Sequence, residues 1–286
     1  MNGNMNRAKS SSMQSSVSNS AQKKGRLHQH FYRNGEDHRA GADVSFQDIL
    51  RLFHFRSIEI GKWVTEEEKR IAANLFFDAL CDLMDILQVP ESVICLNGTL
   101  SLGFGVGGQK HASAHYNSAK KQLSLAKNAG AGALAHEWFH AFDHYIAKKM
   151  YSVTGSNLFA SEIWLNERKK LVPHELNKQL AACFSNIFLD ATSTGPSELM
   201  QRSIFVDQKL KSFYYARPQE VAARAFEAVI QNQSIKNAFL VQGTMQSAEA
   251  KLGIYPQAEQ RDQITSTLLT YFSWLGQALE GIKKAP

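Results

Sequence analysis

The sequence predicts an α+β fold, in which a small mixed β-sheet is followed by a mostly helical C-terminal half. Segments that are rich in β-forming residues and broken by glycine are confined to residues 56–126. Apolar residues at helical spacing dominate from residue 132 onward. Of the 286 residues, 44% are hydrophobic and 20% are charged, which is typical of a globular protein with a sizeable core.

Residues 1 to about 40 are polar and rich in Ser and Asn, so we expect a disordered leader before a single domain over residues 41–286. The leader also carries the charge excess. The net charge is +6, and the first 33 residues hold six Lys or Arg and no acidic residue. Such a basic segment can contact nucleic acid or an acidic partner. Because no aromatic residue is interleaved with these charges before Phe31, we expect a solvated leader. The rest of the chain has equal numbers of basic and acidic residues, so we expect no nucleic-acid binding there.

Several classes of protein are not indicated. No apolar run reaches the roughly 20 residues that cross a bilayer, and the N-terminus lacks the apolar core of a secretory signal. Cys81, Cys95 and Cys183 are widely spaced and odd in number, unlike a disulfide framework or a cysteine zinc site. We therefore expect a cytoplasmic protein with free thiols and no membrane insertion.

The first elements have clear boundaries. A helix is expected over residues 45–53 with Ser45 as its N-cap, and a short strand or extended loop over residues 56–63. Thr65 and Glu68 form a capping box at the start of a long amphipathic helix that stops before Pro90.

The β-region follows. Residues 93–106 suggest one or two strands, and residues 112–116 and 122–126 a hairpin. The glycine-rich run 103–108 lacks the Lys-Ser/Thr of a phosphate-binding loop. We therefore predict a bent edge strand or a turn over these residues. Such a strand could bind an extended substrate by adding it to the sheet as a further strand. Helices are then expected over residues 132–150, 158–172, 174–189, 197–212, 218–231 and 262–283.

The run His136-Glu137-Trp138-Phe139-His140 places H-E-x-x-H in a helix. Residues i and i+4 share a helical face, so two imidazoles can converge on one ion. Zinc binds His nitrogen and carboxylate oxygen, lowers the pKa of a bound water to about 7 and polarises a carbonyl. Glu137 is then placed to act as general base on that water. This motif predicts a zinc-dependent hydrolase.

The motif also occurs by chance, in helices with two surface or core histidines. Here residues 130–135 are small and apolar, which predicts that the helix packs tightly in the core. Two unpaired histidines and a glutamate would be costly there, so we favour the metal site.

The third ligand must come from another segment. Asp143 and Ile146 occupy the positions where the metzincin pattern requires Gly and His, so that arrangement is excluded. Glu162 is one candidate on a later helix. Glu220 and Glu227 are better candidates, because Pro218 starts their helix and Ala-rich spacing allows close packing. They share a face, and spacing alone does not choose between them.

The blocks GALAHEWFHAFDHY and RPQEVAARAFE resemble the zinc-peptidase-like domain of large polyvalent proteins of phages and conjugative elements, and its stand-alone bacterial CLCA-like relatives. With FRSIEIGKWV, DALCDLMDIL and LNGTLSLGFGVGGQKHASAHYN the resemblance covers about residues 45–235. A more distant similarity is to the catalytic domain of anthrax lethal factor, a gluzincin. The resemblance implies a zincin-like fold whose sheet packs on the motif helix.

The lethal factor similarity also implies roles for residues. His136, His140 and Glu220 match the zinc ligands, and Tyr214 or Tyr215 falls near the tyrosine that assists the reaction electrophilically. Arg224 stands where that family has a second Glu, which is a departure.

Other polar residues near the motif receive lesser roles. Asp143 shares the histidine face and is expected to accept a hydrogen bond from a ligand imidazole. His144, His111 and His115 are not expected to be ligands.

We therefore predict a bacterial zinc metallopeptidase that hydrolyses a peptide bond in a protein or peptide substrate, with a Glu-activated zinc-bound water. One alternative is a catalytically silent zincin-like module that binds metal and protein. The other is a nucleic-acid-associated accessory protein of a mobile element. The sequence indicates no cleavage specificity.

Overall fold

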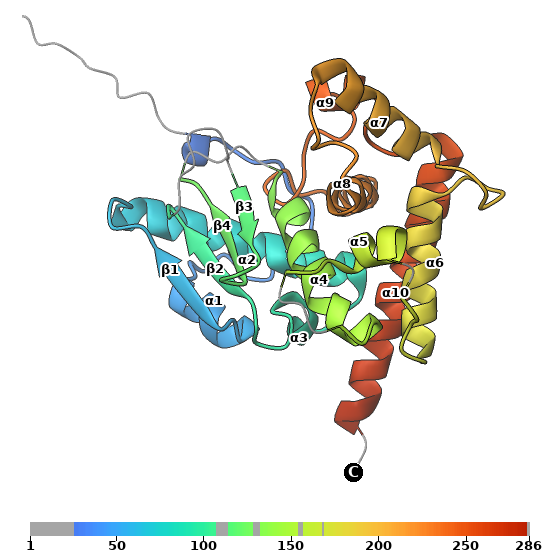
Figure 1. Ribbon diagram of the computed structural model, residues 1–286. Helices are drawn as coiled ribbons and strands as arrows, with labels where there is room; N and C mark the ends of the chain where they lie inside the picture. The colour runs from blue at the N-terminus through green and yellow to red at the C-terminus, as the bar shows by residue number, and fades with distance from the viewer. Residues whose placement is uncertain (1–25, 107–113, 128–131, 154–156, 168, 285–286) are drawn as a thin grey trace, which may run out of the picture.

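The computed structural model describes residues 26–106, 114–127, 132–153, 157–167 and 169–284 (Figure 1). The N-terminal half contains the short elements and the sheet: η1 Arg26–His28, α1 Phe46–Phe53, β1 Ser57–Ile60, α2 Glu66–Leu87, α3 Glu91–Ile94, β2 Ser101–Phe104, β3 Ala114–Asn117 and β4 Gln122–Leu125. The C-terminal half is helical: α4 Leu134–Met150, α5 Ala160–Glu162, a π-helical turn η2 Ile163–Glu167, α6 Glu175–Phe188, α7 Glu198–Leu210, α8 Pro218–Gln231, α9 Ala248–Lys251 and α10 Ala258–Lys284.

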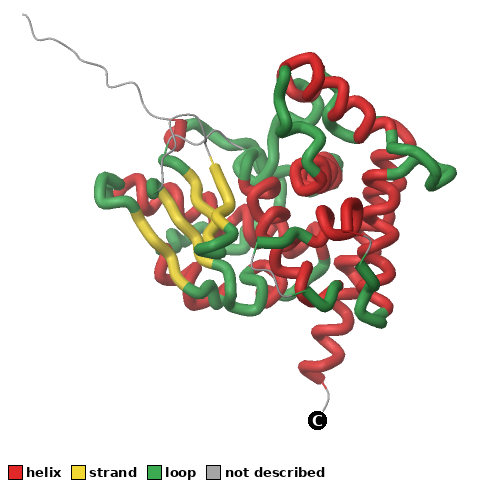
Figure 2. Tube along the Cα trace, in the orientation of Figure 1, coloured by secondary structure: helices red, strands yellow, loops and turns green. Residues whose placement is uncertain are grey.

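The sheet has four strands in the order β1-β2-β4-β3. β2 pairs in parallel with both β1 and β4, and β3 pairs antiparallel to β4 as the predicted hairpin. The sheet is therefore mixed, and the α and β segregation expected from the sequence is confirmed (Figure 2).

Two predictions made from the sequence for the β-region were wrong. Gly103 and Phe104 lie in β2, which has a partner on each side, so this part of residues 103–108 is not an edge strand; residues 107–108 lie outside the described residues. The start of the expected strand at residues 93–106 is instead helical, because α3 follows directly from Pro90 and buries Val93 and Ile94. A short buried apolar run does not distinguish a strand from a helical turn.

Helix α4 lies at the centre of the molecule. It contacts β3 and β4 on one side and α5 and α8 on the other (Figure 1). Trp138 is fully buried and lies against Phe142, Phe226 and Phe272 at ring-centroid distances of 5.5–5.9 Å. Phe139 stacks on Phe226 at 4.8 Å. The motif helix is thus held rigidly in the core, as the small and apolar residues before it predicted.

The predicted helix starts and stops mostly agree with the structure. Ser45 and Thr65 both form complete capping boxes. The helix expected over 158–172 is shorter, because the π-helical turn ends at Glu167 and Leu171 bridges to Tyr151 in extended conformation. Within the described residues, no helix is both long and apolar enough to cross a bilayer.

The leader requires a correction. Residues 1–25 lie outside the described residues, but residues 26–40, which we expected to be disordered, make specific contacts. Arg33 bridges to Asn237 in an antiparallel β-bridge and forms an ion pair with Asp82, and Arg39 forms an ion pair with Asp78. Ion pairs with α2 and main-chain pairing with residue 237 hold these polar residues in place. The composition of the segment, which is low in apolar residues, gives no sign of such long-range polar partners.

Candidate functional site

Two imidazoles of α4 converge at the helix surface. His136 and His140 are one helical turn apart, and their Nε2 atoms lie 2.9 Å from each other. Neutral imidazoles that both present lone pairs at this distance repel each other. The pair therefore needs a shared proton or a shared cation between the two nitrogens.

Helix α8 brings a carboxylate to the same point. Glu220 lies in its first turn, with Oε2 at 3.3 Å from His136 Nε2 and Oε1 at 3.5 Å from His140 Nε2. The close approach is possible because α8 presents fully buried alanines, Ala222, Ala223 and Ala225, in its core-facing turns.

The three side chains fit a metal ion. Their ligating atoms all lie within 4.8 Å of one another. Zinc with ligands at about 2.0–2.1 Å in a tetrahedron would separate them by about 3.3 Å, close to the distances observed. Glu220 Oε2 is buried with no hydrogen-bond partner among the described residues, which is the situation of an oxygen that lacks its cation.

Glu227 occupies a different position from Glu220. Its Oε2 lies 3.0 Å from His136 Nδ1, on the side of the ring that faces away from Glu220. A carboxylate there accepts the Nδ1 proton and leaves Nε2 with its lone pair free for a metal. Of the two carboxylates that spacing left open, Glu220 lies at the converging nitrogens and Glu227 behind them. Glu162, at the end of α5, is not in the converging group of described residues.

The carboxylates change the protonation of the pair. Burial alone lowers the pKa of His136, but the charge of Glu227, its hydrogen bond to Nδ1 and the nearby Glu220 carboxylate outweigh burial and raise that pKa to about 10. Burial raises the pKa of Glu220, but the close approach of the His136 and His140 imidazoles outweighs burial and holds that pKa well below its usual range. Without a metal, the site is an imidazolium paired with carboxylates.

Asp143 does not have the partner that we expected. Its carboxylate accepts the Ser161 amide at 2.9 Å and the Ser161 hydroxyl at 2.5 Å, which ties α4 to α5. His140 Nδ1 is buried and has no hydrogen-bond partner among the described residues. Burial raises the pKa of Asp143 to about 6 in spite of the bonds from Ser161.

The other histidines lie elsewhere. His144 Nδ1 lies 2.7 Å from the Tyr116 hydroxyl, on the side of α4 toward β3. His115 lies on β3 and is not part of the converging group, and His111 lies outside the described residues.

An open cleft of about 460 Å³ lies beside the His136 imidazole. His136, Glu137, Tyr214, Tyr215, Arg224 and Tyr255 are among the side chains that line it. Glu137, in the first turn of α4, thus faces the same cleft as His136.

Tyr214 and Tyr215 differ in their surroundings. Tyr214 is 43% exposed on the cleft, and partial burial together with the neighbouring Glu220 carboxylate raises the pKa of its phenol. Tyr215 instead packs against the buried Arg224, whose guanidinium carbon lies 5.7 Å from the centroid of the Tyr215 ring. The phenol of Tyr214 is therefore the one that lies beside Glu220.

Sequence reasoning missed Tyr255. This residue, in the loop between α9 and α10, also lines the cleft. Burial and the Glu227 carboxylate raise the pKa of its phenol. It lies in an irregular loop with no motif around it, so no signal in the sequence marks it.

The loop that carries the two tyrosines is fixed from both sides. Asp207 of α7 accepts the main-chain amides of Tyr214, Tyr215 and Ala216 at 2.8–3.1 Å. Arg224, only 3% exposed, donates to the Tyr215 carbonyl. Arg224 is therefore a buried cation that helps to hold the tyrosine loop in place.

Comparison with known proteins gives one match. Residues 206–279 match the family model described as large polyvalent protein-associated domain 1. No curated protein and no solved structure matches the chain. The matched segment contains α8 with Glu220 and Glu227 but not the motif helix α4. The match supports the predicted link to large polyvalent proteins of phages and mobile elements over this segment of the chain.

Proposed function

We propose that this chain is a zinc-dependent metallopeptidase of the gluzincin type. The observation that carries the proposal is the convergence of Glu220, from α8, on the two imidazoles of the H-E-x-x-H helix. His136, His140 and Glu220 would hold the zinc, and Glu227 would orient His136.

The zinc ion and the side chains of the protein would have different parts in the reaction. Zinc, when bound, supplies Lewis acidity to a water and to a carbonyl. Glu137, on the cleft beside His136, takes a proton from the attacking water and passes it to the nitrogen of the leaving amine. The Tyr214 hydroxyl, which lines the same cleft, would donate a hydrogen bond to the carbonyl oxygen as that oxygen gains negative charge.

The resemblances stated from the sequence belong to this proposal. A small mixed sheet beside the motif helix is compatible with the zincin-like fold that the CLCA-like resemblance implies, and the lethal factor similarity would make Glu220 the third ligand. The open cleft has room for an extended peptide, so a protein or peptide segment is the proposed substrate.

The test is cleavage of a mixed-sequence peptide library by the zinc-loaded protein, read by mass spectrometry. Glu137→Gln should lower cleavage about 10²–10⁴-fold, because only the general base is lost. Its zinc content should stay unchanged. Glu249→Gln removes an exposed carboxylate from the same cleft and serves as the control. Full activity in Glu137→Gln would refute the mechanism. Zinc-loaded wild-type protein that cleaves nothing would favour the silent metal-binding module.

A further inference from the structure

Helix α4 starts without a side-chain cap. Ala133 occupies the N-cap position, and its methyl side chain cannot accept a hydrogen bond from the amides of the first turn, which carries His136 and Glu137. The free amides at a helix start need acceptors. Here the Leu240 carbonyl accepts the Ala135 N–H of the first turn at 3.0 Å, and the Phe239 carbonyl accepts the Gly132 N–H, just before the helix, at 3.2 Å.

A buried asparagine shapes the segment that supplies these carbonyls. Asn237 is 5% exposed, and its Oδ1 accepts the amides of Phe239 and Leu240 at 2.9 and 3.0 Å. Its Nδ2 donates to Asp82 Oδ2 at 2.7 Å. The turn that caps α4 is therefore held by one side chain, which is in turn held by a carboxylate of α2.

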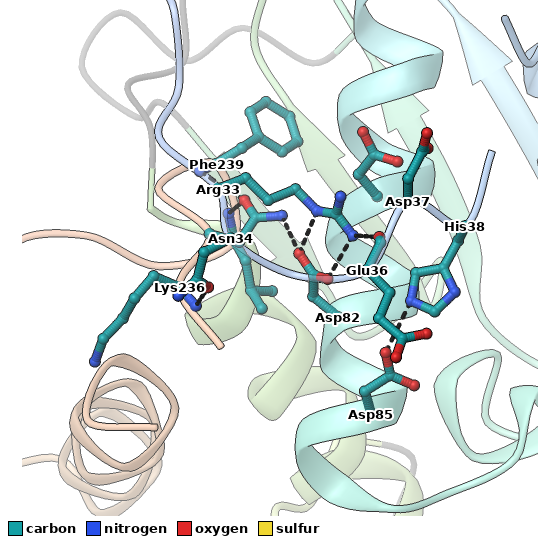
Figure 3. A network of polar contacts seen from close by, with 12 residues as sticks. Arg33, Asn34, Glu36, Asp37, His38, Asp82, Asp85, Lys236 and Phe239 are labelled. Atoms are coloured by element: carbon teal, nitrogen blue, oxygen red, sulfur yellow. Dashed lines mark hydrogen bonds and ion pairs between the residues drawn. The ribbon is translucent and has the colours of Figure 1, made fainter. Parts of the chain in front are cut away.

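The N-terminal segment completes this network. The strap, which we define as residues 31–42, runs past α2 and residues 234–238 (Figure 3). Arg33 donates to both oxygens of Asp82 at 2.7 Å, and the Asp82 side chain is fully buried. Its neighbours Tyr32 and Asn34 pair with the main chain of Ala238 and Lys236.

Apolar contacts reinforce the same connection. Phe31 of the strap lies edge-on against Phe239 at 5.5 Å, and Phe239 lies edge-on against Phe76 of α2 at 5.4 Å. Phe239, whose carbonyl accepts the Gly132 amide, is thus held by the packing of its own ring as well as by the hydrogen bond to Asn237.

We infer that Asn237, held by Asp82 and the strap, is a positioning residue for the metal site. It acts through the cap of α4: it sets the carbonyls that fix the first turn, and that turn carries His136 and Glu137. The strap is then a brace whose attachment governs metal affinity, and not only a stabilising segment. This inference rests on the proposed zinc site and adds a determinant of its affinity.

The experiment measures zinc affinity by competition with a chromophoric chelator. Asn237→Ala should weaken binding about 10-fold, as loss of an outer partner of a metal site does. Asn237→Ser, whose hydroxyl can still accept an amide hydrogen bond, should recover part of that loss.

Asn177→Ala is the matched control. Asn177 is also a buried asparagine, but it lies on α6 and donates to the carbonyl of Lys149, near the far end of α4, and to the carbonyl of Val172. It should lower stability and leave zinc affinity unchanged. Equal affinity in Asn237→Ala and wild type, or an equal loss in Asn177→Ala, would overturn the inference.

Hydrogen exchange separates this inference from the proposed function. In metal-free protein the Ala135 amide should exchange faster in Asn237→Ala than in wild type or Asn177→Ala. Wild-type protein that binds no zinc would defeat the metallopeptidase proposal, but the exchange rate of Ala135 would still decide whether Asn237 positions the helix start. Unchanged exchange would overturn it.

Discussion

At the scale of single residues, protonation and metal binding compete for the same atoms. His136 Nε2 faces His140 Nε2 and Glu220, while Glu227 lies at its Nδ1. The sequence indicated both imidazoles from the spacing of the motif, since i and i+4 share a helical face. It did not separate Glu220 from Glu227, because seven residues are two turns and only the docking of α8 on α4 decides which carboxylate meets Nε2.

The raised pKa of His136 has a measurable consequence. With a pKa of about 10, against an ordinary value of 6.5, the metal-free imidazole is protonated at pH 7. Its pairing therefore stabilises the metal-free fold fully below about pH 6.5, and this stabilisation is lost as the pH rises through about 10.

Zinc requires the neutral imidazole, so binding at pH 7 should release at least one proton, and apparent affinity should rise with pH up to about 10. Calorimetry in two buffers of different ionisation enthalpy counts the protons. Zinc binding at pH 7 with no proton release would contradict this protonation state.

At the scale of elements, most helices were predictable because their ends carry local signals. Ser45 and Thr65 cap their helices through their own side chains, and Pro90 follows the end of α2. Helix α4 has no such signal at its start, since its cap comes from residues distant in the chain. The turn before it is instead built around Gly132, which has φ +96° and lies against residue 242.

Gly132→Ala should therefore destabilise the protein more than left-handed strain alone. A Cβ at this position would lie 2.3 Å from the Gln242 amide nitrogen, which is main chain and cannot move easily. Gly41 also has positive φ, at +75°, but nothing lies within 4 Å of its would-be Cβ.

We expect Gly41→Ala to cost about 1 kcal/mol, the strain term, and Gly132→Ala at least twice that amount. Urea unfolding of the two variants measures the difference. Equal losses would show that the close approach of the two segments does not matter.

At the scale of the whole molecule, long-range polar contacts join the N-terminal strap, α2, the segment after α8 and the motif helix. The sequence could not predict this, because a polar segment of low hydrophobicity resembles a disordered leader until its partner is known. The partner here is Asp82, on an amphipathic helix whose polar positions were expected to face solvent. The strand region and the helical second half, by contrast, follow from local composition and apolar spacing.

Arg33→Met should destabilise the fold by on the order of 3 kcal/mol, because it leaves the buried Asp82 carboxylate without its cation. Arg51→Met removes an arginine whose ion pair with Asp48 is exposed, and it should leave the unfolding midpoint almost unchanged. Thermal or urea unfolding compares the two. A midpoint for Arg33→Met as high as that of Arg51→Met would mean that the strap is not a structural part of the domain.

The most direct test of the central claim is the metal content of purified protein after zinc is supplied, for wild type beside Glu220→Ala and Glu227→Ala. The proposed site predicts close to one zinc per chain in wild type and loss of that zinc in Glu220→Ala. In Glu227→Ala, zinc should remain but bind more weakly, because His136 loses only its orienting partner. Loss in Glu227→Ala alone would move the third ligand, and wild-type protein without zinc would contradict the metal site.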